Sequence, residues 1–143
     1  WTAAALNSAV YDCFGTLNIP VSFLSVEFIH DQMEGEISGE AHKLGEQYLQ
    51  SLGGQSQVYF STSLGGRCVD QLINGVANES KVGYWSFTSS VQTQIAKDAE
   101  LMNSGVVNGV NWHFFTSPVT GLGGPSQPLL KALQSSGIGV IVH

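Results

Sequence analysis

The residues of this chain that could do chemistry together are Asp70, Glu79 and Lys81, in the stretch RCVDQLINGVANESKVG, residues 67–83. The pair Asn74-Gly75 divides two apolar runs and predicts a β-hairpin with a two-residue loop. Counting outward from that loop puts Asp70 directly opposite Glu79, with Lys81 on the same face. Opposed side chains in a hairpin have β-carbons about 4.5–5.5 Å apart, where two like charges are destabilising. The pattern therefore predicts a compensating cation beside the two carboxylates.

A divalent cation would remove this repulsion and would bring hydrolytic chemistry with it. Mg²⁺ is usually held by one or two carboxylates together with substrate phosphate oxygens, and Mn²⁺ or Zn²⁺ are alternatives. With Asp70 and Glu79 on the metal, Lys81 can hold a water or a phosphate oxygen for in-line hydrolysis of a phosphodiester. Taken alone, the three residues also fit a solvated hairpin edge in which Lys81 simply pairs with Glu79. The surrounding elements decide between the two interpretations.

The surrounding sequence predicts a mixed α/β domain. A helix is expected over GEISGEAHKLGEQYLQSLGG, with Ser38 as its N-cap and Gly53-Gly54 at its end. Strand, helix, strand, helix and strand in succession imply parallel neighbours in a mixed sheet with helices on both faces. The further expected elements are a strand at 56–62, a turn at Gly65-Gly66, the hairpin, a helix at 89–105 capped by Ser89 or Ser90 and ended by Gly105, a strand at 109–117, a helix at 125–137 and a strand at 138–143.

The composition limits the classes of protein that remain. A chain of 143 residues with 43% hydrophobic and 11% charged residues fits one compact domain. We expect residues 1–35 to be a lead-in and residues 36–143 to form that domain. The net charge of −6, with five Lys and Arg, argues against broad nonspecific affinity for nucleic acid. No apolar run approaches the roughly 18 residues that cross a membrane, so no membrane-spanning segment is expected.

Two further features concern the context of the chain. Cys13 and Cys68 are too few for a disulfide framework, and we expect both to be reduced and packed as small apolar residues. The chain starts at Trp1, without a methionine or a signal peptide, which predicts that it is cut from a longer protein.

The order of elements around the motif resembles the PD-(D/E)xK nuclease superfamily, the restriction-endonuclease-like fold. The resemblance covers residues 36–117: a helix, a strand, a strand with Asp70, a turn, and a strand with Glu79-Ser80-Lys81. It implies that Glu40 of the first helix is a further acidic metal ligand, in preference to Glu46, and that Gln92 or Gln94 of the next helix reaches the site. Val69 stands where many members have proline.

The C-terminal part resembles a second group of proteins. Its WHFF…GPS…LL…L…GI arrangement, residues 112–138, is similar to nuclease toxins at the C-termini of large exported bacterial proteins of the contact-dependent inhibition and Rhs types. This resemblance implies a secreted or cell-surface-delivered toxin that acts in the cytoplasm of a target cell and a cognate immunity protein. It implies DNA or tRNA as substrate, with DNA slightly favoured.

The remaining candidates carry weaker signals. Arg67 and Lys97 are candidates for substrate contact, although strand alternation puts Arg67 on the face opposite Asp70. His113, on an apolar strand, is more typical of a hydrogen-bonded core histidine than of a general base. GLGGPSQ lacks the lysine of a phosphate-binding P-loop, and no Gly-x-Ser-x-Gly hydrolase motif occurs. The rival from another class is a non-catalytic interaction module whose hairpin charges form a salt-bridged surface.

Overall fold

The computed structural model describes residues 43–143, so the predicted lead-in 1–35, the N-cap Ser38 and the candidate ligand Glu40 lie outside the described residues. The described chain begins with a helix at 43–51, which ends before Gly53 and Gly54, both at positive φ. The other elements are β1 (Gln55–Thr62), β2 (Gly65–Ile73), β3 (Val76–Val82), β4 (Tyr84–Trp85), α3 (Ser89–Asn103), β5 (Gly109–Phe115), β6 (Gly124–Pro125), α4 (Gln127–Ser135) and β7 (Gly139–Val142).

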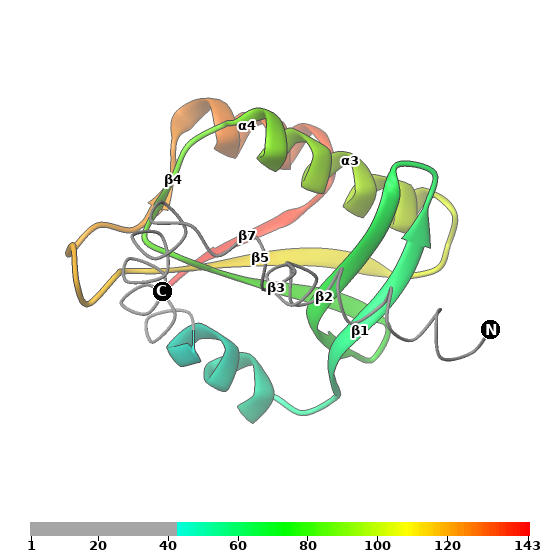
Figure 1. The fold of residues 1–143 in the computed structure, drawn as a ribbon, viewed down its shortest axis with the longest axis horizontal. Helices are drawn as coiled ribbons and strands as arrows, with labels where there is room; N and C mark the ends of the chain where they lie inside the picture. The colour runs from blue at the N-terminus through cyan, green and yellow to red at the C-terminus, as the bar shows by residue number, and fades with distance from the viewer. Residues whose placement is uncertain (1–42) are drawn as a thin grey trace, which may run out of the picture.

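The main sheet confirms the prediction of a mixed α/β domain. Its five strands lie in the order β1-β2-β3-β5-β7. The pairs β1–β2 and β2–β3 are antiparallel, whereas β3–β5 and β5–β7 are parallel, as the strand–helix alternation predicted. Helices α3 and α4 cover one face of the sheet and helix 43–51 covers the other (Figure 1). Within residues 43–143, no helix is long and apolar enough to cross a membrane.

The hairpin between β2 and β3 forms at the predicted loop. Asn74 and Gly75 have φ values of 50° and 79°, the left-handed conformations that a type I′ turn requires at both central positions. The preceding turn differs from the prediction, because Ser63 and Leu64 make it while Gly65 and Gly66 belong to β2. The Glu100 side chain of α3 accepts hydrogen bonds from the amide and the hydroxyl of Ser63, which ties this turn to the helix.

The helices begin and end at polar and glycine signals. Thr88, one residue before the predicted caps, is the N-cap of α3, because its backbone is extended and its hydroxyl accepts the Val91 amide at 3.3 Å. Gly105, at a φ of 78°, follows the end of α3 as predicted. Ser126 caps α4. The paired strands β4 and β6 were not predicted, since two residues are too short for a periodic pattern.

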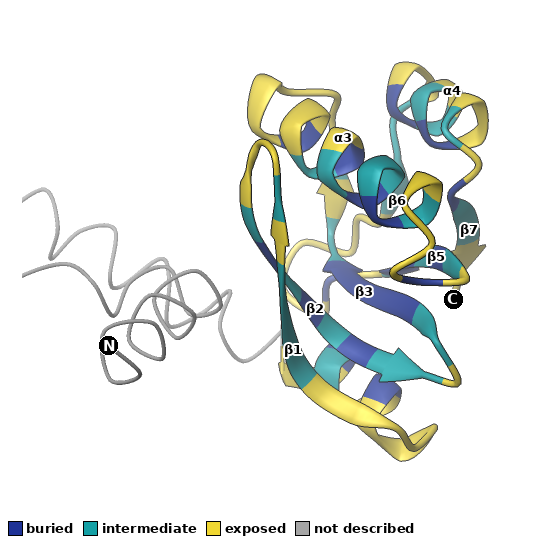
Figure 2. Ribbon diagram, turned by 90° about the vertical axis from the view of Figure 1, so that its right-hand side faces the viewer, coloured by how far each residue is buried: buried dark blue, intermediate teal, exposed yellow. Residues whose placement is uncertain are grey.

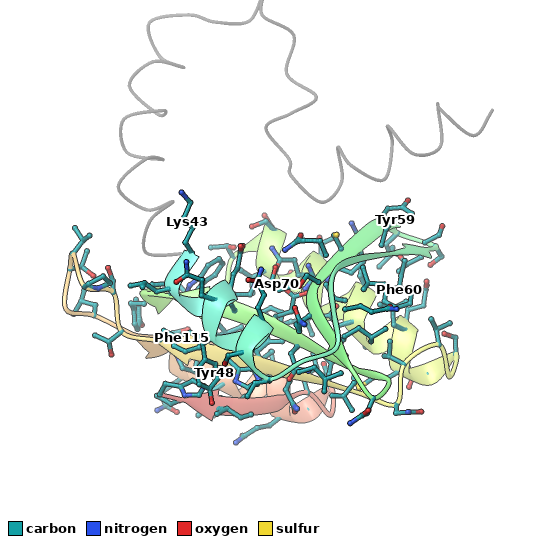
Figure 3. All side chains as sticks on the ribbon, turned by 90° about the horizontal axis from the view of Figure 1, so that it is seen from below. Lys43, Tyr48, Tyr59, Phe60, Asp70 and Phe115 are labelled. Carbon is teal, nitrogen blue, oxygen red and sulfur yellow. The ribbon has the colours of Figure 1, made fainter. Side chains whose placement is uncertain are left out.

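The core lies between the sheet and the two helices α3 and α4. The inward-facing residues of β3, β5 and α3 are buried, while the outer faces of the helices are exposed (Figure 2). On the opposite face, Tyr48 of helix 43–51 packs edge-on against Phe115 with ring centroids 5.5 Å apart (Figure 3). The buried apolar cluster consists of Val69, Ala77, Val91, Ile95, Leu101, Val107, Val110, Trp112, Phe114, Leu129, Leu133 and Ile138.

Cys68 corrects one expectation. It is disulfide-bonded, so the prediction of a reduced thiol is wrong for this residue. Composition alone could not decide this, because a disulfide depends on which sulfurs the fold brings together. Cys13, the other cysteine of the sequence, lies outside the described residues.

Candidate active site

The regular sheet is interrupted at Asp70. The ladder between β2 and β3 runs outward from the turn as far as Gln71–Asn78 and stops one pair short of Asp70 and Glu79. The ladder with β1 also skips Asp70. In place of the next pair, the Asp70 carboxylate accepts the amide of Ser80 at 2.8 Å. The expected direct opposition of Asp70 and Glu79 is therefore wrong, because the Asp70 carboxylate accepts the Ser80 amide where the next backbone pair would form.

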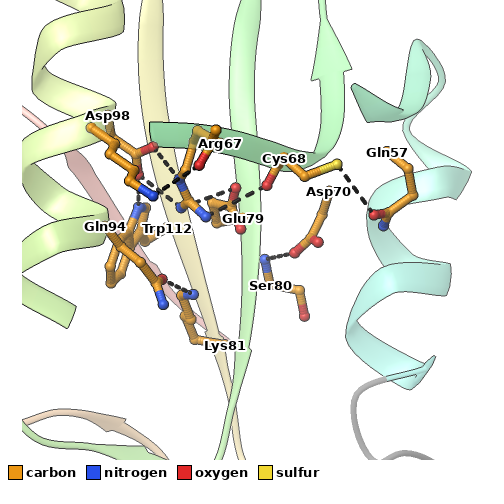
Figure 4. Close-up of polar contacts among 12 residues, drawn as sticks. Gln57, Arg67, Cys68, Asp70, Glu79, Ser80, Lys81, Gln94, Asp98 and Trp112 are labelled. Carbon is orange, nitrogen blue, oxygen red and sulfur yellow. Dashed lines mark hydrogen bonds and ion pairs between the residues drawn. The ribbon is translucent and has the colours of Figure 1, made fainter. Parts of the chain in front are cut away.

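A cavity of about 330 Å³ lies beside this interruption. Residues of helix 43–51, β2, β3, β4 and α3 line it, and most of the residues that the motif predicted are among them. Glu79 and Lys81 lie on the α3 side of β3, whereas Asp70 lies in the gap nearer to helix 43–51 (Figure 4). The ionisable and amide side chains that line the cavity are Glu46, Arg67, Asp70, Glu79, Lys81, Gln94 and Lys97.

Glu79 is a buried carboxylate with incomplete pairing. Only 3% of the residue is exposed. Arg67 Nη2 lies 3.2 Å from Glu79 Oε1 as an ion pair, yet this oxygen accepts no hydrogen bond. Burial raises the pKa of Glu79 to about 8, although the charges of Arg67 and Lys81 act in the opposite direction. A further cation at this carboxylate would favour its ionised form.

Arg67 and Asp98 form a buried network behind Glu79. The Arg67 guanidinium donates through Nε to Asp98 Oδ1 at 2.7 Å and through Nη2 to Asp98 Oδ2 at 3.1 Å. The indole of Trp112 donates to Asp98 Oδ2 at 2.9 Å. Arg67 thus lies on the α3 side with Glu79 and away from Asp70, which agrees with the expectation that strand alternation puts Arg67 opposite Asp70. The residue that differs from the prediction is Asp70, which does not share the face of Glu79 and Lys81.

Lys81 is held in a buried aromatic environment. Its Nζ donates to Gln94 Oε1 at 2.8 Å and lies 4.7 Å and 4.6 Å from the ring centroids of Trp85 and Trp112. Burial lowers the pKa of Lys81, while the neighbouring carboxylates raise it. Of the two predicted glutamines, Gln94 reaches the cavity, whereas Gln92 is exposed and does not line it.

Helix 43–51 brings a third carboxylate to the cavity. Glu46 lines it, and burial together with the charge of Asp70 raises the pKa of Glu46. The helix approaches β3 closely at Gly45, where an added β-carbon would overlap Ser80 Oγ. The resemblance favoured Glu40 over Glu46, but Glu46 is the helix carboxylate that the described residues place at the cavity.

Two other predicted residues have defined partners. Lys97 lines the cavity, and its Nζ donates to the carbonyl oxygen of Gly66 at 2.9 Å. His113 is buried, and its Nε2 and Nδ1 lie 2.9 Å from Asn78 Oδ1 and 3.0 Å from His143 Nε2. His113 does not line the cavity, in agreement with the prediction of a hydrogen-bonded core histidine.

Sequence reasoning missed Asp98 and Trp85. A signal for Asp98 was available, because residues three and four apart share a helix face. Gln94, Lys97 and Asp98 are so spaced, and all three face β2 and β3. Trp85 gave no signal, since its two-residue strand has no periodicity.

The donor set of the cavity fits a hard divalent cation. Carboxylate oxygens are what Mg²⁺ and Mn²⁺ prefer, and Glu79 Oε1 is buried without a hydrogen-bond donor. In the part of the chain that the structure describes, no three or more His, Cys, Asp and Glu side chains form a ready metal cluster. A cation bound at these carboxylates would need further ligands from water or substrate.

No family model, curated protein or solved structure matches this chain.

Proposed function

We propose that this protein is a metal-dependent nuclease that hydrolyses phosphodiester bonds in the cavity beside Asp70. One observation carries the proposal: side chains from β2, β3 and α3 bring two carboxylates, a buried lysine and its glutamine partner to a single cavity. This combination agrees with the resemblance to the PD-(D/E)xK superfamily and its restriction-endonuclease-like fold.

Asp70, Glu79 and Glu46 are the residues that would hold the cation, which is Mg²⁺ in our proposal, with Mn²⁺ or Zn²⁺ as alternatives. When bound, the cation supplies charge to polarise the phosphoryl oxygen and to acidify an attacking water. Glu79 lies toward α3 and Asp70 toward helix 43–51 (Figure 4), so the two carboxylates would approach a bound cation from different directions.

Lys81 orients the nucleophile in this proposal. The residue is only 5% exposed, and Gln94 and the two indole rings limit the positions open to its ammonium group. An immobilised donor loses little freedom when it binds a water or a phosphate oxygen.

In this proposal Arg67 compensates the negative charge of Glu79 and does not bind substrate. Asp98 holds its guanidinium beside Glu79, so the positive charge remains in the cavity wall whether or not substrate is present. Lys97 lies at the cavity edge beside Gly66 and is the residue that we propose for contact with a substrate phosphate.

The biological setting of the proposal comes from the second resemblance. We propose a toxin domain, delivered by a secreted or cell-surface protein into the cytoplasm of a target cell and neutralised by an immunity protein. DNA is slightly favoured as its substrate, and tRNA is the alternative.

The test is cleavage of plasmid DNA and of total tRNA, each with Mg²⁺ and with EDTA. Lys81→Ala removes the proposed positioning amine, and Lys131→Ala removes an exposed lysine of α4 as the matched control. We expect Mg²⁺-dependent cleavage of one substrate that is lost in Lys81→Ala and kept in Lys131→Ala. No cleavage of either substrate by the folded protein would refute the nuclease and favour a non-catalytic interaction module.

A further inference from the structure

A second cavity, of about 340 Å³, adjoins the first. Its lining residues run from the end of β3 through β4 to the start of α3. Trp85 lines both cavities, so the second cavity lies next to the candidate active site across this side chain. The residues that line it are Val82, Tyr84, Trp85, Ser86, Thr88, Ser90 and Val91.

Trp85 is fixed between the two cavities. Its indole Nε1 donates to the carbonyl oxygen of Val82 at 3.0 Å, and its own carbonyl accepts the amide of Ser126 at 2.8 Å. On the side of the active site, the Lys81 ammonium lies over the Trp85 ring. A wall held by three contacts is preformed, as ligand cavities usually are.

Tyr84 is a second aromatic residue that lines this cavity. The residue is 58% exposed, although β4 is held to β6 by backbone pairing. The hydroxyls of Thr88 and Ser90 lie 3.1 Å apart in the same cavity. The cavity therefore combines flat aromatic surface with hydroxyl groups, which suits a planar polar ring.

The charge of the protein restricts how it can bind nucleic acid. The chain has five Lys and Arg and a net charge of −6. Arg67 and Lys81 are buried in the active-site network, so few cations remain for phosphates along a duplex. Stacking of an unpaired base on an aromatic side chain contributes about 1–3 kcal/mol, and this contribution needs no cation.

We propose that the second cavity binds the base of an unpaired nucleotide next to the scissile phosphate, stacked on Tyr84 and Trp85. This inference rests on the proposed nuclease function and narrows the class of nucleic acid that the protein would cleave. The preferred substrate is single-stranded nucleic acid, or a loop or strand end, and not a continuous duplex.

The experiment compares a short fluorescein-labelled single-stranded oligonucleotide with the same strand annealed to its complement. Dissociation constants for the full chain are measured by anisotropy in EDTA, and cleavage of both probes is measured separately in Mg²⁺. The variants are Tyr84→Ala, Tyr84→Phe and, as a control at an exposed apolar residue elsewhere, Val119→Ala.

We expect the single strand to bind more tightly than the duplex. Tyr84→Ala should raise its Kd roughly tenfold to a hundredfold, the range for loss of one base stack. Tyr84→Phe should stay within about twofold, because the ring remains, and Val119→Ala should have no effect. In cleavage, Tyr84→Ala should raise KM far more than it lowers kcat.

The outcomes separate this inference from the nuclease itself. Cleavage that depends on Mg²⁺ but is unaffected by Tyr84→Ala would overturn the base site and leave the nuclease intact. Equal or tighter binding of the duplex would also overturn it. Tyr84-dependent binding of the single strand without any cleavage would support the base site and refute the proposed hydrolysis.

Discussion

Replacing Asp98 by asparagine tests whether the network behind Glu79 holds the fold. Asp98 is fully buried and accepts two hydrogen bonds from Arg67 and one from Trp112. The Asp98→Asn variant would keep the shape of the side chain, but it removes the negative charge and turns one acceptor into a donor that faces Arg67 or Trp112. Removing one partner of a buried ion pair typically costs about 3–5 kcal/mol, because the remaining charge stays buried without compensation.

The expected loss is a large part of the free energy of unfolding, which is about 5–15 kcal/mol for a typical domain. With a denaturant slope of about 2 kcal/mol per M for urea, the unfolding midpoint should fall by roughly 2 M. Urea titration followed by tryptophan fluorescence measures this. The Arg67→Met/Asp98→Asn double variant should be less destabilised than the sum of the two single variants by about 0.5–3 kcal/mol.

The matched control is Glu100→Gln on the same helix. Glu100 also accepts two hydrogen bonds, from Ser63, but it does so at the surface, where water replaces a lost partner. The urea unfolding midpoint of Glu100→Gln should therefore fall much less than that of Asp98→Asn. Equal shifts of the urea midpoint in the two variants would show that burial of the Arg67–Asp98 pair does not increase the cost of removing the charge, and this would refute the prediction.

Three further predictions follow from contacts around the cavity and the core. Gly45→Ala should destabilise the protein by about 1–3 kcal/mol, because the added methyl group clashes with Ser80 Oγ. Adding Ser80→Ala should recover part of this stability, since the buried Ser80 hydroxyl has no hydrogen-bond partner to lose. If the double variant shows no recovery in thermal unfolding, the clash is contradicted. Burial and a neighbouring histidine lower the pKa of His113 to about 4 from 6.5, so the unfolded chain binds the extra proton between these values. The free energy of unfolding should therefore fall as the pH drops from 6.5 to about 4, and His113→Gln should flatten this dependence; an unchanged slope would refute it. Because the charge of Asp70 helps to raise the pKa of Glu46, Asp70→Asn should lower the Glu46 pKa in a carboxyl NMR titration, and an unchanged value would place the two carboxylates too far apart to interact.

Local signals in the sequence predicted most of the elements. Asn74-Gly75 specified its turn because both residues accept positive φ, and the paired glycines after helix 43–51 mark its end for the same reason. The alternation of strands and helices after Lys81 predicted the parallel pairs β3–β5 and β5–β7. These signals depend on residues a few positions apart, so they can be recognised without knowing which distant residues pack against them.

The candidate site was predicted less completely. The types and spacing of Asp70, Glu79 and Lys81 identified three side chains that meet at one cavity. The choice of Gln94 over Gln92 needed the position of α3 against β3, because a helix face is defined only by what packs on it.

The sequence by itself determined the hairpin, the order of the elements and the residue types that carry the chemistry. Tertiary structure alone decided that the ladder breaks at Asp70, that Glu46 reaches the cavity and that Arg67 turns toward Asp98, 31 residues away. The physical reason is that backbone preferences are local, whereas the pairing of a buried charge depends on which distant side chain can enter the same low-dielectric space.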